Sequence, residues 1–270
     1  MTYNFDTILD RRQSDSIKWQ WYGDALPMWV ADMDFRSPEP VTAALRARVE
    51  HGIFGYAGEP RELRDVLAAW LQRRFAWTVP TEAFVIVPGV VTAFNVACRA
   101  FCAPGDGVLV QAPVYPPMRT APANFGLTRD EMELTRGADG RYTVDEDLMN
   151  ATITDRTKLF LLCSPHNPTG RVFNKAELAR MAEISLRRGL VICSDEIHAD
   201  LVYPEHPHTP LASLAPEIAA RSITLMAPSK TFNVPGLGFS FAVIENKELR
   251  RQYKAAAADI VPHVGLMGYT

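Results

Sequence analysis

From residue 84 onward, short runs that are almost wholly apolar alternate with longer segments of helical periodicity. Apolar runs of this kind, separated by helices, are typical of a parallel sheet with both faces covered, because every side chain of such a strand is buried. The pattern therefore predicts an α/β fold, with a mostly parallel sheet and helices on both faces. The predicted strands are residues 84–87, 107–111, 127–132, 158–163, 190–194, 222–226 and 238–244.

Helical spacing of apolar residues fills most of the gaps between these runs. The first forty residues, in contrast, are rich in aromatic and turn residues and predict an extended arm with little regular structure. We expect residues 1–45 to form this N-terminal arm and part of a small domain, and residues 46–270 to form one large domain. Helices are predicted to begin near Pro40 and to cover residues 62–75, 89–101, 117–124, 175–187 and 248–258.

The composition excludes several classes of protein. With 28 basic against 31 acidic residues the formal net charge is −3, so the basic excess of a nucleic-acid-binding protein is absent. Hydrophobic residues make up 47% of the chain, yet its most apolar stretch, residues 84–97, is too short and too interrupted to span a membrane. The first residues lack the features of a signal peptide, and the four cysteines show no Cys-x-x-Cys spacing. We therefore expect a cytoplasmic protein with free thiols.

Ligands of open parallel sheets bind at the carboxyl ends of the strands, so the residues that follow each predicted strand are candidates for a site. Gly89, Val90 and Val91 begin a helix whose free N–H groups suit a phosphate, although a Pro-Gly pair before a helix is common. Tyr115 follows the next strand, where its ring can stack on a flat ligand or serve the structure alone. Asn167 lies between two prolines that hold its amide in place, in a loop that can also be simply a rigid turn.

Two charged residues follow apolar strands as well. Asp195 ends a buried run and needs a cationic partner, unless it caps a helix. Lys230, one of only six lysines, has small and apolar neighbours; a desolvated lysine is a nucleophilic amine at neutral pH, whereas a surface lysine extends into water. His206-Pro207-His208 has no acidic or cysteine partner at metal-ligand spacing, so no metal site is expected.

A phosphate cradle, a stacking aromatic ring, an amide, a carboxylate and an amine are thus predicted at one edge of one sheet. The ligand that needs all five is pyridoxal phosphate (PLP), whose aldehyde forms a Schiff base with a lysine and whose ring nitrogen needs an acidic partner.

Several segments also resemble a known family. Residues 164–170 (Ser-Pro-His-Asn-Pro-Thr-Gly), 195–198 (Asp-Glu-Ile-His) and 228–233 (Pro-Ser-Lys-Thr-Phe-Asn) resemble class I/II aminotransferases of PLP fold type I. Residues 29–35 (Trp-Val-Ala-Asp-Met-Asp-Phe) and 52–56 (Gly-Ile-Phe-Gly-Tyr) resemble the MalY/PatB group of cystathionine β-lyases within that class. The resemblance extends from about residue 3 to the end of the chain.

The resemblance implies a catalytic and a cofactor-binding role for the residues at the strand ends. Lys230 would bind the cofactor covalently and move the Cα proton of the substrate, while Asp195 would pair with the ring nitrogen. Asn167 would donate to the ring oxygen, and His198 stands where many relatives have a tyrosine that also reaches this oxygen. Tyr115 would stack on the ring.

The resemblance also implies a phosphate site and a substrate pocket. Ser229 would assist the backbone N–H groups of the helix start in holding the phosphate, and Tyr56 would reach the phosphate site of the partner subunit in a homodimer. The pocket for a small amino-acid substrate would be lined by Val30, Ala31 and Asp32.

The expected function is that of a PLP-dependent carbon–sulfur β-lyase, which releases pyruvate, ammonia and a thiol from cystathionine or another cysteine S-conjugate. Aminotransfer is an alternative, because the ring chemistry permits both reactions and the pocket decides between them. Cofactor binding without catalysis is the other alternative. The resemblance implies a C-terminal small domain with an arginine that binds the substrate carboxylate. We expect this chain to be a truncated form of a longer protein, with a naturally short chain as the alternative.

Overall fold

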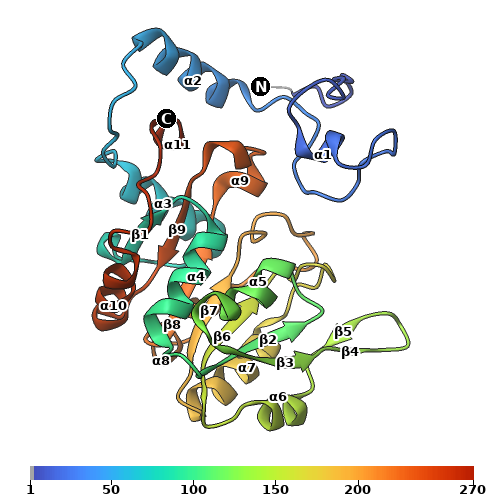
Figure 1. Ribbon diagram of the computed structural model, residues 1–270, viewed down its shortest axis with the longest axis vertical. Coiled ribbons are helices and arrows are strands. Elements are labelled where there is room, and N and C mark those ends of the chain that lie inside the picture. Colours follow the sequence, from blue (N-terminus) through green and yellow to red (C-terminus); the bar gives the residue numbers. More distant parts are fainter. Residues whose placement is uncertain (1–2) are drawn as a thin grey trace.

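The computed structural model describes residues 3–270 and contains a seven-stranded sheet in the order β1-β9-β8-β7-β6-β2-β3 (Figure 1). Strands β3, β2, β6, β7 and β8 run parallel to one another, whereas β9 runs antiparallel to both β8 and β1. The predicted α/β class with a mostly parallel sheet is confirmed. The strands are β1 (Phe84–Val87), β2 (Gly107–Ala112), β3 (Thr128–Glu133), β6 (Thr157–Cys163), β7 (Val191–Asp195), β8 (Ser222–Met226) and β9 (Ser240–Val243).

Helices connect the strands and cover both faces of the sheet. None of the helices in residues 3–270 combines the length and the apolar character needed to cross a membrane. They are α1 (Ile17–Gln20), α2 (Glu39–His51), α3 (Leu63–Phe75), α4 (Val90–Phe101), α5 (Pro116–Thr120), α6 (Glu146–Thr152), α7 (Lys175–Arg187), α8 (Pro216–Ala219), α9 (Pro228–Thr231), α10 (Lys247–Ala257) and α11 (Leu266–Tyr269).

Several parts of the chain differ from the sequence prediction, and two of them lie between β2 and β6. The helix expected over residues 117–124 is divided into α5 and a 3₁₀ turn at Ala121–Phe125, since Pro122 has no N–H with which to continue an α-helix. A small hairpin, β4 (Thr135–Arg136) and β5 (Tyr142–Thr143), and the helix α6 were not predicted. These elements are short and carry too few apolar residues for a periodic signal.

The N-terminal arm lies at one end of the sheet, where it is drawn in blue in Figure 1. Before α2 it contains one short helix, α1, among the described residues. The predicted division of the chain after residue 45 remains a prediction, and α2 is continuous through that position.

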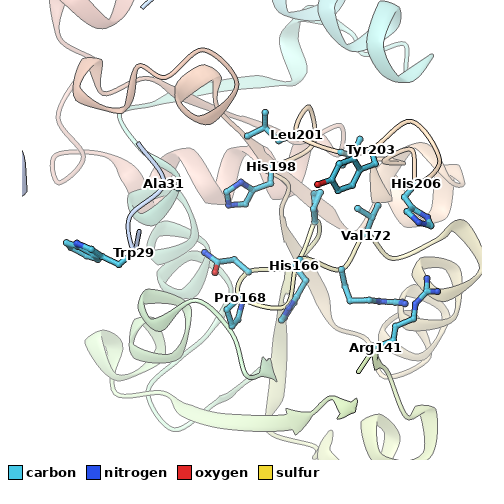
Figure 2. A pocket seen from close by; sticks show the side chains of 15 residues that line it. Trp29, Ala31, Arg141, His166, Pro168, Val172, His198, Leu201, Tyr203 and His206 are labelled. Carbon is cyan, nitrogen blue, oxygen red and sulfur yellow. The ribbon is translucent and has the colours of Figure 1, made fainter. Parts of the chain in front are cut away.

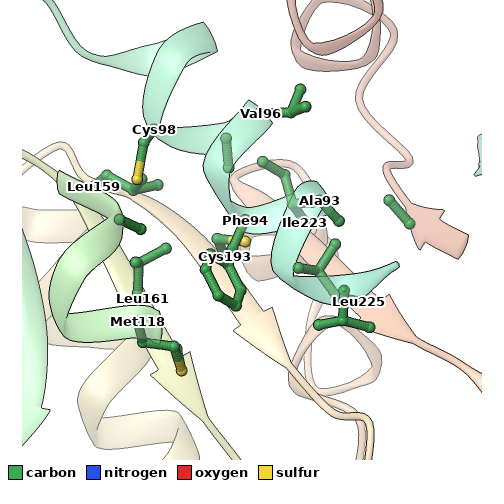
Figure 3. Close-up of a cluster of buried hydrophobic side chains, with 14 of the residues drawn as sticks. Ala93, Phe94, Val96, Cys98, Met118, Leu159, Leu161, Cys193, Ile223 and Leu225 are labelled. Atoms are coloured by element: carbon green, nitrogen blue, oxygen red, sulfur yellow. The ribbon is translucent and has the colours of Figure 1, made fainter. Parts of the chain in front are cut away.

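Helix α4 packs its apolar face onto the sheet and forms the centre of the largest core (Figure 3). Phe94 is fully buried and points toward the strands that carry Leu161, Cys193 and Ile223. The hydroxyl of the buried Tyr253, on α10, donates a 2.9 Å hydrogen bond to the carbonyl oxygen of Ala93. These contacts fix the direction in which the amino-terminal end of α4 points. The four cysteines are free thiols, as predicted.

Helix α7 is fixed at its start by a capping box. The Asn174 side chain accepts a 3.0 Å hydrogen bond from the N–H of Glu177, and the Glu177 carboxylate accepts a 2.8 Å bond from the N–H of Asn174. The same carboxylate accepts a hydrogen bond from the guanidinium of Arg171. The loop that follows β6 is thereby attached to the start of α7.

The core around α4 gives a prediction about stability. We expect Phe94→Ala to lower the free energy of unfolding by about 3–5 kcal/mol, because it removes a buried ring and leaves a cavity between α4 and the sheet. Urea denaturation followed by circular dichroism would measure the change. The control Ile8→Ala alters a side chain that is 94% exposed and should change stability by less than about 0.5 kcal/mol. Equal effects of the two variants would contradict the assigned packing.

Candidate functional site

A cavity of about 510 Å³ opens at the carboxyl ends of the strands, within the volume range of small-molecule sites. Its lining comes from the N-terminal arm and from the segments that follow β1, β2, β6, β7 and β8. We call it the strand-end cavity. Eleven of the thirteen predicted site residues line it: Val30, Ala31, Gly89, Val90, Val91, Tyr115, Asn167, Asp195, His198, Ser229 and Lys230.

The amino-terminal end of α4 faces this cavity without a side-chain cap. The N-cap residue is Gly89, which has no side chain to accept hydrogen bonds from the first N–H groups of the helix. The N–H groups of the first turn, including those of Val90 and Val91, are therefore free for a ligand at the positive end of the helix dipole. An anion is the ligand that such a helix start binds best.

Tyr115 and Asn167 are joined by their backbones. The N–H of Tyr115 donates a 3.0 Å hydrogen bond to the carbonyl oxygen of Asn167, and the N–H of Asn167 donates to Sγ of Cys163 over 3.4 Å. Burial, together with the nearby negative charge of Asp195, raises the pKa of the Tyr115 hydroxyl above its ordinary value. Tyr115 therefore remains neutral, with an aromatic ring on the cavity wall.

Asp195 is the last residue of β7 and is only 4% exposed. It does not begin a helix, so the alternative of a helix cap is excluded; its Oδ1 instead accepts a 3.1 Å hydrogen bond from the N–H of Ile197. Burial raises the pKa of Asp195 to about 7, and the charge of Glu196 adds to this, while the Ile197 hydrogen bond and the positive charge of Lys230 oppose it. A cationic group in the cavity would lower this pKa and keep the carboxylate ionised.

Lys230 lies in the short helix α9 and is partly buried. The next residue, Thr231, donates a 3.0 Å hydrogen bond from its hydroxyl to Asp200. The other carboxylate oxygen of Asp200 accepts a 2.9 Å bond from Nε of Arg74, on α3. The segment that carries Lys230 is therefore attached to a neighbouring helix through Asp200.

His198 lines the same cavity one turn beyond β7. Burial, and after it the positive charge of Lys230, lower the pKa of His198 below its ordinary value. The imidazole is thus neutral near pH 7 and has one donor and one acceptor nitrogen for a ligand.

Asn233 connects the Lys230 segment to the arm. Its Oδ1 accepts a 2.8 Å hydrogen bond from the N–H of Met33, and its Nδ2 donates to the carbonyl oxygens of Met33 at 3.0 Å and Phe35 at 3.3 Å. Asn233 has a φ of 55°, a left-handed conformation that asparagine adopts more readily than most residues. We call this arrangement the arm clamp.

A second set of contacts, centred on the Asp34 carboxylate, also stabilises the arm. Asp34 accepts hydrogen bonds from Lys18, Trp19 and Arg11 at 2.8, 2.9 and 2.6 Å. Burial by itself would raise the pKa of Asp34, but these donors outweigh burial and lower the pKa to about 2. Val30 and Ala31, which precede these anchored residues in the arm, are thereby held at the wall of the strand-end cavity.

Two predicted site residues do not line the strand-end cavity. Asp32 accepts a 2.9 Å hydrogen bond from Arg11 and borders an adjoining hollow that also contains Val30 and Lys230. Tyr56 is completely exposed in the irregular segment between α2 and α3, away from the cavity of its own chain.

Several important residues were missed by the sequence reasoning. The Glu196 carboxylate turns away from the strand-end cavity and forms a 2.7 Å buried pair with His208, so the two neighbouring acids have different surroundings. His208, which the sequence reasoning left without an acidic partner, thus has one. Asp200 and Asn233 were also missed, because their partners lie far away in the sequence and no local pattern indicates them.

Comparison with known proteins shows which family the chain is similar to. Residues 30–263 match the family model of aminotransferase class I and II. Cystathionine β-lyase PatB of Bacillus subtilis is 43% identical over 260 residues, which cover 94% of this chain and 67% of that protein. Protein MalY of Escherichia coli is 31% identical over 261 residues, which cover 94% of this chain and 66% of that protein.

A solved structure with the same fold is the PLP-bound C–S lyase from Staphylococcus hominis. It is 31% identical, has a TM-score of 0.91, and matches across 100% of this chain and 69% of that chain. The chain spans about two thirds of the length of the curated relatives named above. Because the family model covers most of the chain, the resemblance predicted from the sequence is confirmed, and the chain belongs to the class I and II aminotransferase family.

Proposed function

We propose that this chain binds pyridoxal phosphate in the strand-end cavity and, as a carbon–sulfur β-lyase, cleaves cysteine S-conjugates such as cystathionine. The observation that carries the proposal is that Lys230, Asp195 and the uncapped start of α4 all border one cavity. An amine, a buried acid and an anion site are the groups that this cofactor needs.

The residues present fit the cofactor. Asp195 is a buried carboxyl group whose only hydrogen bond from the described residues comes from one backbone N–H, so the ring nitrogen would supply the missing partner. The start of α4, with Ser229 nearby, would hold the phosphate, and Tyr115 would face the ring. Asn167 and His198 would reach the ring oxygen from the adjoining loops.

When bound, the cofactor supplies an electron sink that stabilises negative charge at Cα of an amino acid. The chain's own groups would perform the other tasks. Asp195 would stabilise a proton on the ring nitrogen, and Lys230 would take the proton from Cα and return it where the reaction requires it. Trp29, Val30 and Ala31, held by the arm clamp, would cover the cavity from the arm side and limit the access of water.

Elimination is proposed in preference to aminotransfer because of the proteins that the chain is similar to. PatB is named a cystathionine β-lyase and the S. hominis protein a C–S lyase. In elimination the C–S bond breaks, sulfur leaves with the bonding electron pair, and the remaining three-carbon unit becomes pyruvate and ammonia on hydrolysis.

We also propose that the chain acts as a homodimer. Tyr56 and its neighbours Ile53 and Phe54 are exposed in one irregular segment, which leaves them free to contact another subunit. In that arrangement Tyr56 would hydrogen bond to the phosphate in the partner subunit.

The proposed activity is tested by the products. The chain loaded with pyridoxal phosphate and mixed with cystathionine should release pyruvate and a thiol in equal amounts. Conversion of the cofactor to its amine form without pyruvate would indicate aminotransfer, and a borohydride-reducible chromophore without turnover would indicate binding alone. Lys230→Ala should lower turnover by roughly 10²- to 10⁴-fold, the usual contribution of a positioned proton-transfer group.

The surroundings of Asp195 give a prediction for the cofactor-free protein. Burial raises its pKa to about 7 in the folded chain, from an ordinary value of 3.8, so between these pH values the folded state binds a proton that the unfolded state has lost. The contribution of Asp195 to stability therefore decreases as pH rises from 4 to 7, by up to about 1.4 kcal/mol per pH unit. Urea denaturation across this pH range, compared between the wild type and Asp195→Asn, isolates the effect. A constant difference between the two proteins would contradict it.

The arm clamp gives a prediction for turnover. Asn233→Gly keeps a residue that tolerates the left-handed backbone but removes the three side-chain hydrogen bonds to the arm. We expect kcat/KM to fall by about 10- to 100-fold, because the pocket wall is no longer held in position. The cofactor absorbance should be retained, and Asn233→Asp, which keeps the bond accepted from Met33, should lose less. Unchanged kinetics in Asn233→Gly would exclude a role for the clamp.

A further inference from the structure

A second cavity, of about 500 Å³, adjoins the strand-end cavity (Figure 2). The two cavities have Trp29, Ala31, Asn167 and His198 in common, so they adjoin each other at these side chains. In the view of Figure 2, Trp29 lies at one end and Tyr203, His206 and Arg141 lie at the other. We call this second space the outer cavity. The function proposed above does not use its far end.

The ionisable side chains that line the outer cavity are mainly basic. Its described lining contains two arginines and three histidines, and none of its lining residues is acidic. The arginines come from different parts of the fold: Arg141 directly precedes β5 in the hairpin, and Arg171 lies in the loop after β6. A site of this composition favours an anionic ligand.

One of the two arginines already has a partner. Arg171 is 7% exposed, donates a hydrogen bond to the Glu177 carboxylate, and lies 5.0 Å from the ring centre of Phe173. Its charge is therefore balanced by Glu177, and its role is to hold the loop after β6 to the start of α7.

The other arginine is free. Arg141 is exposed, and among residues 3–270 no carboxylate forms an ion pair with it. Its backbone is fixed because its N–H donates to the Asp139 side chain and its carbonyl oxygen accepts from the N–H of Gly137. The guanidinium is therefore presented from an ordered hairpin, with its donors available to a ligand.

The nearer histidines contribute hydrogen bonds and no charge. Burial, and after it the positive charge of Arg171, lower the pKa of His166 to about 4, and burial likewise lowers the pKa of His198. Arg141 therefore carries a permanent positive charge in the outer cavity, and no carboxylate of residues 3–270 pairs with it.

We propose that the outer cavity binds the thiol leaving group of the substrate, and that Arg141 selects leaving groups that end in a carboxylate. This inference rests on the proposed lyase function, because a leaving group exists only in that reaction. A group attached to Cβ of an amino acid beside Lys230 extends past His198 and Asn167 into this space. The planar guanidinium can then bind the carboxylate through two hydrogen bonds. Arg141 acts on specificity and takes no part in the bond-breaking step.

The inference is tested with a matched pair of substrates, S-(2-carboxyethyl)-L-cysteine and the neutral side-chain amide of the same compound. The loaded wild-type chain should prefer the acid in kcat/KM by about tenfold, since a hydrogen bond between charged groups is stronger than one to a neutral group. Arg141→Gln should remove this preference and leave turnover of the amide unchanged. Added salt should weaken the preference in the wild type, because the site is open to solvent.

Two further variants control for effects on folding. Arg156→Gln changes an exposed arginine next to the amino end of β6, at the opposite end of the strands, and should keep the wild-type preference. Arg141→Lys should keep part of the preference, because lysine preserves the charge but lacks the planar pair of donors. A wild-type chain that turns over acid and amide equally would overturn the proposal.

A binding measurement separates this inference from the lyase function itself. Titration calorimetry with 3-(methylthio)propanoate and its amide uses probes that have no amino group and cannot react. The wild type should bind the acid more tightly than the amide, by about tenfold, and Arg141→Gln should bind both alike. Discrimination in binding without pyruvate formation from either substrate would refute the lyase function and retain the anion subsite. Pyruvate from both substrates with no discrimination would retain the function and refute the subsite.

Discussion

Parallel pairing of β6, β7 and β8 is the constraint on which the site depends. In this register Cys163 lies opposite Asp195, and Asp195 lies opposite Leu225, so the three strands end at one level. The end of β7 and the segments that follow β6 and β8 therefore bring a carboxylate, an amide and an amine to the same cavity. A shift of β7 by one residue would turn Asp195 to the other face of the sheet. Such a shift is costly because both faces of β7 are buried, so side chains packed in one core would be moved into the other, where they do not fit.

The electrostatics of the site follow from the same arrangement. The two neighbouring acids at the end of β7 are both buried. Glu196 has a histidine, a hydroxyl and a backbone N–H as partners, whereas the Asp195 carboxylate has, among residues 3–270, one backbone N–H. A buried acid with so few partners has a raised pKa, so Asp195 is partly protonated near pH 7 until a cation stabilises its ionised form. The fold thus separates a structural acid from a ligand-binding acid that stands next to it in the sequence, by directing them to opposite sides of one strand end.

Much of this could be predicted from the sequence, because the signals were local. The apolar runs identified the seven strands of the main sheet, and the rule that ligands bind at the carboxyl ends of strands identified most of the cavity lining. Strand direction could not be predicted in the same way, so the reversal of β9 was missed: periodicity reports which faces are buried and not which way the chain runs. The contact between Asn233 and Met33 joins residues 200 positions apart and has no local signal either. Asp32 stands within the predicted pocket segment, but the position of Arg11 turns its side chain toward the arm.

The arm clamp reaches only main-chain atoms of the arm. A contact of this kind does not depend on which side chains the arm carries at Met33 and Phe35, so these two positions can vary while the clamp persists. Val30 and Ala31 can therefore be exchanged for side chains of other size or polarity without removing these three hydrogen bonds. Such a construction lets a single scaffold acquire new substrate preferences by small sequence changes, during evolution or in a library built at these positions.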